Sequence, residues 1–132
     1  EILIGLVGSE MCIRDSAMTI KQVMETLDAE LLTPEADLTR EVHAACGSDM
    51  MSDVLAYVKD QAVLVTGLNN PQVVRTADMM DMICIVFVRG KKPDGAILQL
   101  AVDRGIAVLA TKLPMFAACG LLYEKGLRGG MA

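Results

Sequence analysis

The sequence predicts a three-layer α/β/α sandwich, in which helices cover both faces of a central parallel or mixed sheet of four to five strands. The main observation is a unit that begins near residues 62, 83 and 106 and carries a short apolar run, a polar loop, a proline and a segment of helical periodicity. Apolar runs rich in Val, Ile and Leu without polar alternation are typical of strands covered on both faces, and the segments between them suit helical crossovers. Right-handed crossovers then place helices on both sides of the sheet.

The first half of the chain predicts the remaining elements in order. Residues 19–29 (TIKQVMETLDA) carry apolar side chains at helical spacing and predict a helix with one buried face. Residues 30–33 and 41–47 (ELLT and EVHAACG) predict short strands separated by a turn at Pro34, and the pairing of these strands stays open. Residues 48–60 (SDMMSDVLAYVKD) again show helical spacing and predict a second helix.

Prolines, an asparagine and glycines mark the helix boundaries in the second half. A proline suits the first turn of a helix because no backbone donor is needed there, which places three prolines at helix starts: Pro71, Pro93 and Pro114. Asn70 stands where its side chain can cap the first of these helices. Gly105 and Gly126 stand where a glycine commonly ends a helix.

A candidate ligand site follows from the predicted sheet, because ligands of open α/β sheets bind beyond the carboxyl ends of the strands, where loops meet helix N-termini. The loops at this edge supply backbone donors, polar side chains and basic side chains, which together suit a phosphate or a carboxylate. The candidate ligand-binding residues are Ser48, Asp49, Thr66, Gly67, Asn70, Arg89, Gly90, Lys91 and Thr111. The alternative is that these loops are polar only because they face water.

Composition narrows the classes of partner and compartment. The chain has a formal net charge of −5 and no apolar run of the roughly 18 residues that a membrane span needs, so neither nucleic acid nor a membrane is an expected partner. Apart from Cys12, the cysteines are Cys46, Cys84 and Cys119, which lie in apolar surroundings without a Cys-x-x-Cys pair. This pattern favours buried thiols in a reducing cytoplasm over disulfides or zinc. The single His43 cannot build a multi-histidine metal site and is expected to have a local structural role.

Motifs for catalysis or for a cofactor are missing from the sequence. The chain lacks the Gly-Lys-Ser/Thr ending of a Walker loop and the patterns GxGxxG and GxSxG. The pairs Asp49/Asp53 and Asp78/Asp81 could each share a helix face, but no nucleophile or histidine accompanies them, and caps or solvated faces are the simpler interpretation. We therefore expect no enzymatic activity and no cofactor, with a minimal hydrolase or transferase as a third alternative.

The first 17 residues are expected to be foreign to the domain. Translated back into codons, residues 6–16 (LVGSEMCIRDS) resemble a transposase-type sequencing-library adapter, and residues 1–5 suit the upstream part of the same adapter. We therefore interpret residues 1–17 as translated adapter sequence, to be left out of the reasoning on the fold. Residues 18–132 then have the length of one compact domain with a single core.

Three stretches together resemble the DRTGG-domain family: SDMMSDVLAYVKDQAVLVTGLNNPQVVRTADMMD, IVFVRGKKPD and TKLPMFAACGLLYEKGLRGG. The resemblance covers nearly everything from Met18 onward and suits a small stand-alone bacterial member. Such domains look like regulatory or assembly modules, found in phosphotransacetylases and between the CBS domains of some pyrophosphatases, and similar to the N-terminal domain of HPr kinase. The resemblance implies a three-layer α/β fold and frequent self-association, and it implies no catalytic role, because those reactions belong to other domains.

The family's pattern carries over to positions at one predicted helix start and along the carboxyl-end edge of the sheet. These positions are Ser48, Asp49, Ser52, Asp53, Thr66, Gly67, Asn70, Arg89, Gly90 and Thr111. In physical terms they supply helix caps, a permissive turn and an edge that suits an anion. The resemblance assigns no catalytic role to any of them.

Two functional hypotheses follow. The leading one is a non-enzymatic regulatory or assembly domain of the bacterial cytoplasm, which self-associates as a homodimer and modulates a partner enzyme or sensor protein. The ten methionines are consistent with adaptable core filling or with an apolar association surface. The alternative is a small-molecule sensor that binds a nucleotide or another phosphorylated metabolite at the carboxyl-end edge. The two are compatible, because a ligand regulates assembly if it binds one assembly state better than another.

Overall fold

The computed structural model describes residues 18–47 and 61–127. Its helices are α2 (Ile20–Leu27), α4 (Pro71–Met79), α5 (Gly95–Asp103) and α6 (Met115–Glu124). Its strands are β1 (Met18–Thr19), β2 (Glu30–Leu31), β3 (Glu41–Val42), β4 (Ala44–Gly47), β5 (Ala62–Thr66), β6 (Cys84–Phe87) and β7 (Ala107–Ala110). The helix predicted at residues 48–60 lies outside the described residues. None of the helices that are described is long and apolar enough to cross a membrane.

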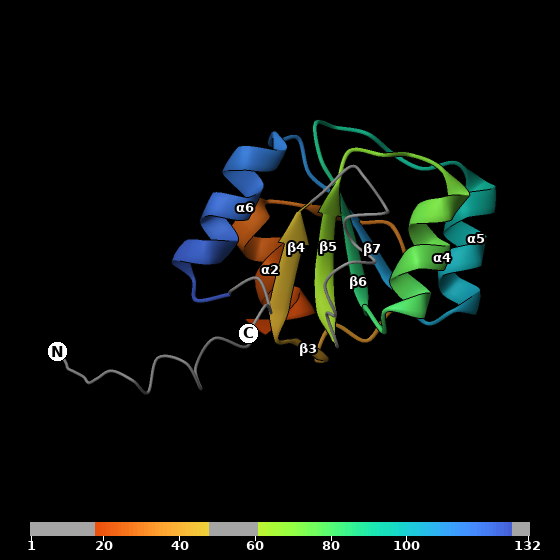
Figure 1. Ribbon diagram of the computed structural model, residues 1–132, viewed down its shortest axis with the longest axis horizontal. Coiled ribbons are helices and arrows are strands. Elements are labelled where there is room, and N and C mark those ends of the chain that lie inside the picture. The colour runs from red at the N-terminus through yellow and green to blue at the C-terminus, as the bar shows by residue number, and fades with distance from the viewer. Residues whose placement is uncertain (1–17, 48–60, 128–132) are drawn as a thin grey trace, which may run out of the picture.

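The central sheet has five strands in the order β2-β7-β6-β5-β4. Strands β4 to β7 run parallel, and β2 joins the edge of the sheet antiparallel to β7. A separate antiparallel ribbon is formed by β1 and β3. The predicted α/β/α sandwich with a mixed sheet is therefore confirmed, and helices lie on both faces of the sheet (Figure 1).

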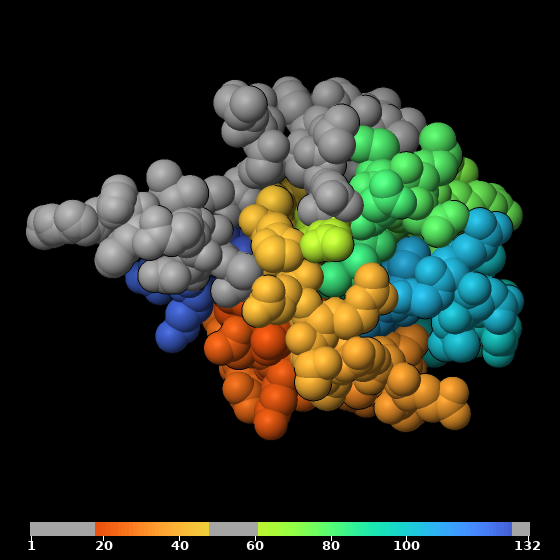
Figure 2. Space-filling view, turned by 90° about the horizontal axis from the view of Figure 1, so that it is seen from below, coloured from red at the N-terminus to blue at the C-terminus, as the bar shows by residue number. Residues whose placement is uncertain are grey.

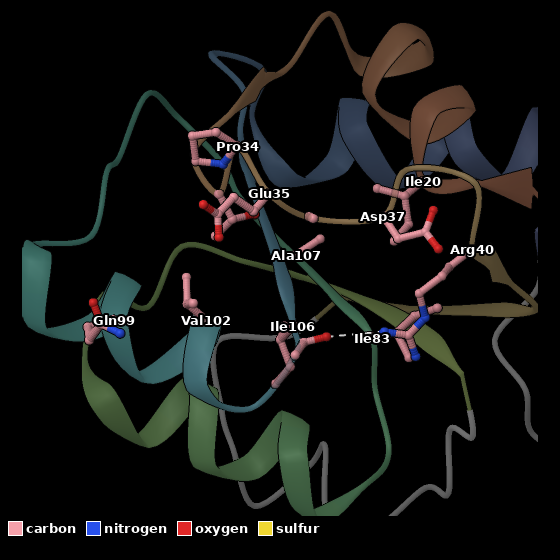
Figure 3. A pocket seen from close by; sticks show the side chains of 13 residues that line it. Ile20, Pro34, Glu35, Asp37, Arg40, Ile83, Gln99, Val102, Ile106 and Ala107 are labelled. Carbon is pink, nitrogen blue, oxygen red and sulfur yellow. Dashed lines mark hydrogen bonds between the residues drawn. The ribbon is translucent and has the colours of Figure 1, made fainter.

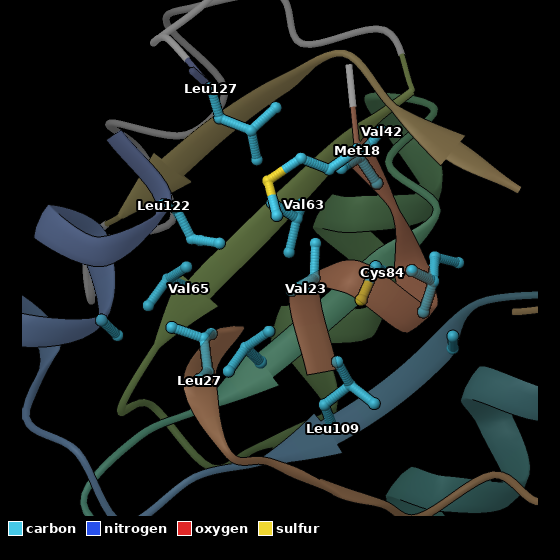
Figure 4. Close-up of a cluster of buried hydrophobic side chains, with 14 of the residues drawn as sticks. Met18, Val23, Leu27, Val42, Val63, Val65, Cys84, Leu109, Leu122 and Leu127 are labelled. Carbon is cyan, nitrogen blue, oxygen red and sulfur yellow. The ribbon is translucent and has the colours of Figure 1, made fainter. Parts of the chain in front are cut away.

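Helices α2 and α6 cover one face of the sheet, and α4 and α5 cover the other (Figure 1). Successive residues of a strand point to opposite faces, so Val63 and Val65 of β5 pack with α2 and α6, whereas Leu64 packs with α4 and α5. Figure 4 shows the first of these cores, in which Leu27 and Leu122 lie against the sheet. Every residue of β5, β6 and β7 is buried, which explains the absence of polar alternation in their sequences.

Helix boundaries predicted from an asparagine, a proline and two glycines are confirmed. Pro71 is the first residue of α4, and Asn70 caps this helix, because its Oδ1 accepts a hydrogen bond from the backbone N–H of Gln72 at 2.9 Å. Gly105 and Gly126 follow the ends of α5 and α6 with φ angles of 72° and 111°. Such positive φ angles favour glycine over residues that carry a Cβ.

Of the other two predicted helix starts, the one at Pro93 is wrong and the one at Pro114 holds. Pro93 lies before α5 instead of in its first turn, because Asp94 takes the cap position and accepts a hydrogen bond from the backbone N–H of Ile97 at 3.0 Å. Pro114 is the N-cap of α6, and its carbonyl accepts a hydrogen bond from the backbone N–H of Ala118 at 3.0 Å. A side-chain oxygen that satisfies a helix N-terminus fixes the start of the helix more strongly than the fixed φ of a nearby proline.

The single strand predicted at residues 41–47 is divided in two at His43. β3 pairs with β1 in the small ribbon, whereas β4 pairs with β5 in the central sheet. The backbone N–H of His43 donates to the carbonyl of Gln61 at 2.9 Å, which joins the dividing residue to the residue before β5. Apolar patterning indicates strand content but not strand partners, so the division is not visible in the sequence.

The prediction of buried thiols is confirmed for Cys84 and holds only in part for the other two described cysteines. Cys84 is fully buried in β6, and burial raises the pKa of its thiol to about 12. Cys46 and Cys119 are half-buried, and burial, with a smaller contribution from Cys46, raises the pKa of the Cys119 thiol. A raised pKa disfavours the thiolate, which is the reactive form of cysteine.

Two buried threonines provide a matched test of hydrogen bonding in this fold. The hydroxyl of Thr111, a residue that is 2% exposed, donates to the carbonyl of Leu27 at 2.8 Å. The hydroxyl of Thr76, in α4, is buried and has no hydrogen-bond partner in the described part of the chain. We expect Thr111→Val to lower the free energy of unfolding by about 1–3 kcal/mol, because it leaves a buried carbonyl without its donor. We expect Thr76→Val to leave that free energy unchanged or to raise it.

Urea unfolding followed by circular dichroism measures both changes, because the slope with urea concentration reports whether the two variants unfold comparable surface. Valine has nearly the shape of threonine, so the two substitutions differ mainly in that Thr111→Val removes hydrogen bonds and Thr76→Val removes none. Equal losses of stability in the two variants, or a gain in Thr111→Val, would contradict the hydrogen bonding described above.

Candidate functional site

The predicted site at the carboxyl ends of the strands forms a continuous edge, which we call the rim: residues 66–70, 89–92 and 111–113. The backbone N–H of Val88 donates to the carbonyl of Thr66 at 3.1 Å, and that of Gly90 donates to the carbonyl of Thr111 at 2.8 Å. These bonds join the loops that follow β5, β6 and β7, so the structure brings the predicted residues of these loops together. Ser48 and Asp49, the first two predicted site residues, lie outside the described residues.

Arg89 and Gly90 form the tightest turn of the rim. Their φ angles are 59° and 72°, and the backbone N–H of Lys91 donates to the carbonyl of Val88 at 3.2 Å. Two successive positive φ angles define a type I′ turn, in which glycine fits easily and arginine adopts a sterically costly conformation. A Cβ on Gly67 would lie 2.5 Å from Nη2 of Arg89, so the guanidinium rests against the Gly67 backbone. Two predicted site residues are therefore in direct contact.

Hydroxyl and amide side chains of the rim hold its loops in shape. Thr66 Oγ1 accepts a hydrogen bond from the backbone N–H of Leu68 at 3.1 Å. Thr111 Oγ1, which donates to α2, also accepts from the backbone N–H of Leu113 at 3.3 Å. Asn70 acts as the cap of α4. These side chains explain how the rim keeps its shape, and the groups with further capacity for an anion are its basic side chains.

Basic side chains gather along the rim although the chain as a whole is acidic. Arg89, Lys91 and Lys112 are exposed there, and Lys92 Nζ forms an ion pair with Glu30 Oε1 at 2.9 Å. The side chains of this pair are 58% and 60% exposed, so it contributes little to stability. Exposed cations beside a backbone turn attract phosphates and carboxylates. A ligand at the rim stays a prediction.

A cavity of about 560 Å³ lies at the other end of the parallel strands, beside their amino ends (Figure 3). Its walls are residues 33–40, the end of α5, and the residues that begin β6 and β7. Figure 2 views the molecule from this side, with residues 30–40 in orange beside α5 in cyan. We call it the amino-end cavity. Sequence reasoning missed it, because the cavity depends on the antiparallel pairing of β2 with β7, which brings residues 33–40 next to α5.

Several hydrogen bonds fix the outer wall of the amino-end cavity. Thr33 Oγ1 accepts from the backbone N–H of Val108 at 3.1 Å in a buried position. Asp37 Oδ1 accepts from the backbone N–H and the hydroxyl of Thr39 at 2.9 and 2.6 Å. Arg40 Nη1 donates to the carbonyl of Gly105 at 3.1 Å, which ties the wall to the end of α5. The wall is therefore held at its start, middle and end.

The carboxylate pair Asp78/Asp81 does not share a helix face, which corrects the prediction for this pair. α4 ends at Met79, and Asp81 follows it in a turn with a φ angle of 57°. Asp78 Oδ2 instead forms an ion pair with Arg104 Nη1 at 2.8 Å. This ion pair lies beside a second hollow of about 350 Å³, which shares Arg40 with the amino-end cavity. The other pair, Asp49/Asp53, lies outside the described residues.

The fold is shared with proteins that contain a DRTGG domain. The sequence model of the DRTGG domain family matches residues 22–124. No curated protein sequence matches the chain. Among solved structures, the chain is similar to the CBS and DRTGG domains of the regulatory region of Clostridium perfringens pyrophosphatase, complexed with the activator diadenosine tetraphosphate. That likeness has a TM-score of 0.70 and 15% identity over 92% of this chain, and it covers 53% of the pyrophosphatase chain, so this chain spans about half of that length.

The pKa of Asp37 predicts how the stability of the fold changes with pH. The hydrogen bond from the Thr39 hydroxyl, followed by that from the Thr39 backbone, holds the pKa of the Asp37 carboxyl below its ordinary value of 3.8. A depressed pKa in the folded state means that ionised Asp37 stabilises the fold above the ordinary pKa, and that this contribution is lost as the pH falls through the folded-state pKa. We expect Asp37→Asn to lower the free energy of unfolding near neutral pH, with a difference from the wild type that shrinks toward acid.

Urea unfolding at several pH values measures this difference. Thr39→Val removes the hydroxyl but keeps the backbone donor, so it should reproduce part of the effect, and the double variant should lose less than the sum of the two single losses. A difference that does not change with pH, or that grows toward acid, would contradict the assigned hydrogen bonds.

Proposed function

Because the chain belongs to the DRTGG domain family, we propose that it is a regulatory domain without catalytic activity, which self-associates as a homodimer and modulates a partner enzyme or sensor protein. The similar solved structure is itself the regulatory region of an enzyme, which supports a regulatory role for this fold. The observation that carries the self-association is the apolar outer face of α6.

The outer face of α6 presents aromatic side chains to solvent. Phe116 is 91% exposed and Tyr123 is 60% exposed. Together with Gly120 they follow a helical spacing of four and then three residues, so they lie on one side of the helix. On the other side, Ala118 and Leu122 are buried in the core under α6. A helix that is apolar nearly all round is normally covered on every side, so this face suits a partner surface.

Gly120 supports a closely packed partner. A glycine inside a helix costs about 1 kcal/mol relative to alanine, so its presence needs a reason. A Cβ added at Gly120 would meet no atom within 4 Å, which means that packing within the described chain does not require glycine there. A glycine between two exposed aromatic side chains lets a second helix approach closely.

A second copy of this chain suits the face best, because the same helix then supplies both halves of a two-fold interface. Glu124 is the one charged residue within α6, so two such faces meet with little charge to desolvate. Phe116 and Tyr123 of each copy would then bury aromatic area at the centre of the contact, where aromatic anchors contribute most.

A second candidate function is sensing of a nucleotide or another phosphorylated metabolite at the rim. The observation that favours it is the Arg89 guanidinium, which a costly turn conformation holds against the backbone of Gly67. Costly backbone conformations cluster at functional sites. The similar pyrophosphatase region is complexed with diadenosine tetraphosphate, which carries the kind of phosphate group that a basic rim attracts.

The homodimer is tested by Phe116→Asp, with Met79→Asp as a matched control. Met79 is 68% exposed at the end of α4, on the far side of the sheet, so both substitutions place a charge at an exposed apolar position. Sedimentation velocity at tens of micromolar should give a dimer for the wild type and for Met79→Asp, and a monomer for Phe116→Asp. A monomeric wild type, or a dimer that Phe116→Asp leaves intact, would reject this interface.

The rim is tested by thermal shift with nucleotides, dinucleoside polyphosphates, acetyl phosphate and sugar phosphates. A ligand at 100 times its dissociation constant adds about 2.7 kcal/mol to the free energy of unfolding. We expect Arg89→Gly to abolish the shift while the fold is kept, because glycine adopts the positive φ of this turn easily. Lys21→Ala removes an exposed cation at the amino ends of the strands, far from the rim, and should bind as the wild type does. No shift with any of these compounds, or an equal shift in Arg89→Gly, would remove the rim as a ligand site.

A further inference from the structure

The amino-end cavity has the dimensions and the apolar lining of a small-molecule site. Its volume of about 560 Å³ lies within the roughly 300–1,000 Å³ that is usual for ligand pockets. Ile83, Ile106 and Ala107, which are buried, form part of the lining, and Val102 of α5 extends it toward solvent with 47% of its surface exposed. Val102 therefore offers a ligand an accessible apolar surface at the mouth of the cavity.

Hydrogen bonds to three other parts of the fold hold the outer wall of the cavity in place. The wall is fixed by Thr33, which accepts a buried hydrogen bond from the Val108 backbone, and by Arg40, which donates to the carbonyl of Gly105. The backbone N–H of Ile20 also donates to the carbonyl of Arg40 at 2.9 Å, so the end of the wall is tied to the start of α2. A wall held in this way loses little conformational freedom on binding, which favours affinity.

Hydrogen-bond acceptors and negative charge dominate the polar part of the lining. Glu35 has no hydrogen bond or ion pair among the residues that the structure describes. Gln99 Nε2 donates to Asp103 Oδ1 at 2.9 Å, which leaves the amide oxygen of Gln99 as an acceptor. Two carboxylates, Glu35 and Asp37, face one cation, Arg40, so the lining carries a net charge of about −1.

The charged groups stand at the two ends of the cavity, and the apolar residues Ile106 and Ala107 lie between them. Figure 3 shows Glu35 and Gln99 toward one end and Asp37 and Arg40 toward the other. Ala107 lies between these ends, and Val102 lies between Gln99 and Glu35. A ligand that fits has an apolar body in the middle and a donor group at the end where Arg40 is absent.

We propose that the amino-end cavity binds a small organic amine, whose ammonium group pairs with Glu35 and whose apolar body packs on Val102 and Ala107. A phosphate is disfavoured here, because Glu35 and Asp37 repel it and the one cation of the lining already donates to the Gly105 carbonyl. The site therefore differs in location and in ligand charge from the rim, and it does not rest on the function proposed above.

Three probes of nearly equal size and different charge test the site: 2-phenylethylamine, 2-phenylethanol and 3-phenylpropionate. Two-dimensional ¹H–¹⁵N NMR spectra of the full chain report binding through the backbone amides of Val102, Gly105 and Ala107. We expect the amine to shift these amides in a saturable way, the alcohol to bind more weakly, and the carboxylate to leave them unchanged. No saturable shift with the amine, or tighter binding of the carboxylate, would overturn the proposal.

Matched variants distinguish specific binding in the cavity from a general attraction of amines to an acidic protein. Glu35→Gln should weaken amine binding about two- to fivefold, the range for an exposed ion pair, and Glu25→Gln, which removes an exposed carboxylate of α2 outside the cavity, should not. Val102→Ser should weaken all binding, whereas Met79→Ser, at an exposed apolar position outside the cavity, should not. Equal losses in Glu35→Gln and Glu25→Gln would show non-specific attraction and would also overturn the proposal.

Discussion

Burial of the parallel strands on both faces determines where the helices and the binding surfaces of this fold can lie. Every residue of β5, β6 and β7 is buried, so helices must cover the sheet on each side, and α2 with α6 and α4 with α5 do so. Neither face of the sheet can then hold a ligand. Among the described residues, the surfaces that stay open to a ligand or a partner include the two ends of the parallel strands and the outer faces of the helices. The rim, the amino-end cavity and the face of α6 lie at these places.

The rim and the amino-end cavity, at opposite ends of the strands, differ in charge. The rim is also connected to α6. The rim gathers arginine and lysine, whereas carboxylates outnumber the single cation of the amino-end cavity. The backbone N–H of Arg89 donates to the carbonyl of Leu113 at 2.8 Å, two residues before α6 begins. A ligand that changes the Arg89 turn would therefore act next to the start of the helix that we propose as the dimer surface. It would regulate assembly to the extent that it binds one assembly state more tightly.

Sequence reasoning predicted the layers because uninterrupted apolar runs and the Asn70 cap are local signals. It could not predict the amino-end cavity, because Thr33 meets Val108 only through the pairing of β2 with β7, and strand partners are not encoded in local patterning. It misplaced the start of α5 because Asp94 competes with Pro93 for the helix boundary. The outer face of α6 did leave a signal, because MFAACGLLYE is apolar nearly all round and a helix of that kind needs cover on more than one side.

In the proposed homodimer, two copies of the chain meet through the outer face of α6. Isotope-filtered NOE spectra of a mixture of labelled and unlabelled chains test it most directly, because they record only contacts between copies. The chain has two phenylalanines and two tyrosines, and Phe87 is fully buried, so its ring is an internal reference that should show no such contact. We expect intermolecular NOEs from the rings of Phe116 and Tyr123 to α6 of the second copy. Intermolecular NOEs confined to another surface, such as that around Met79, would contradict it.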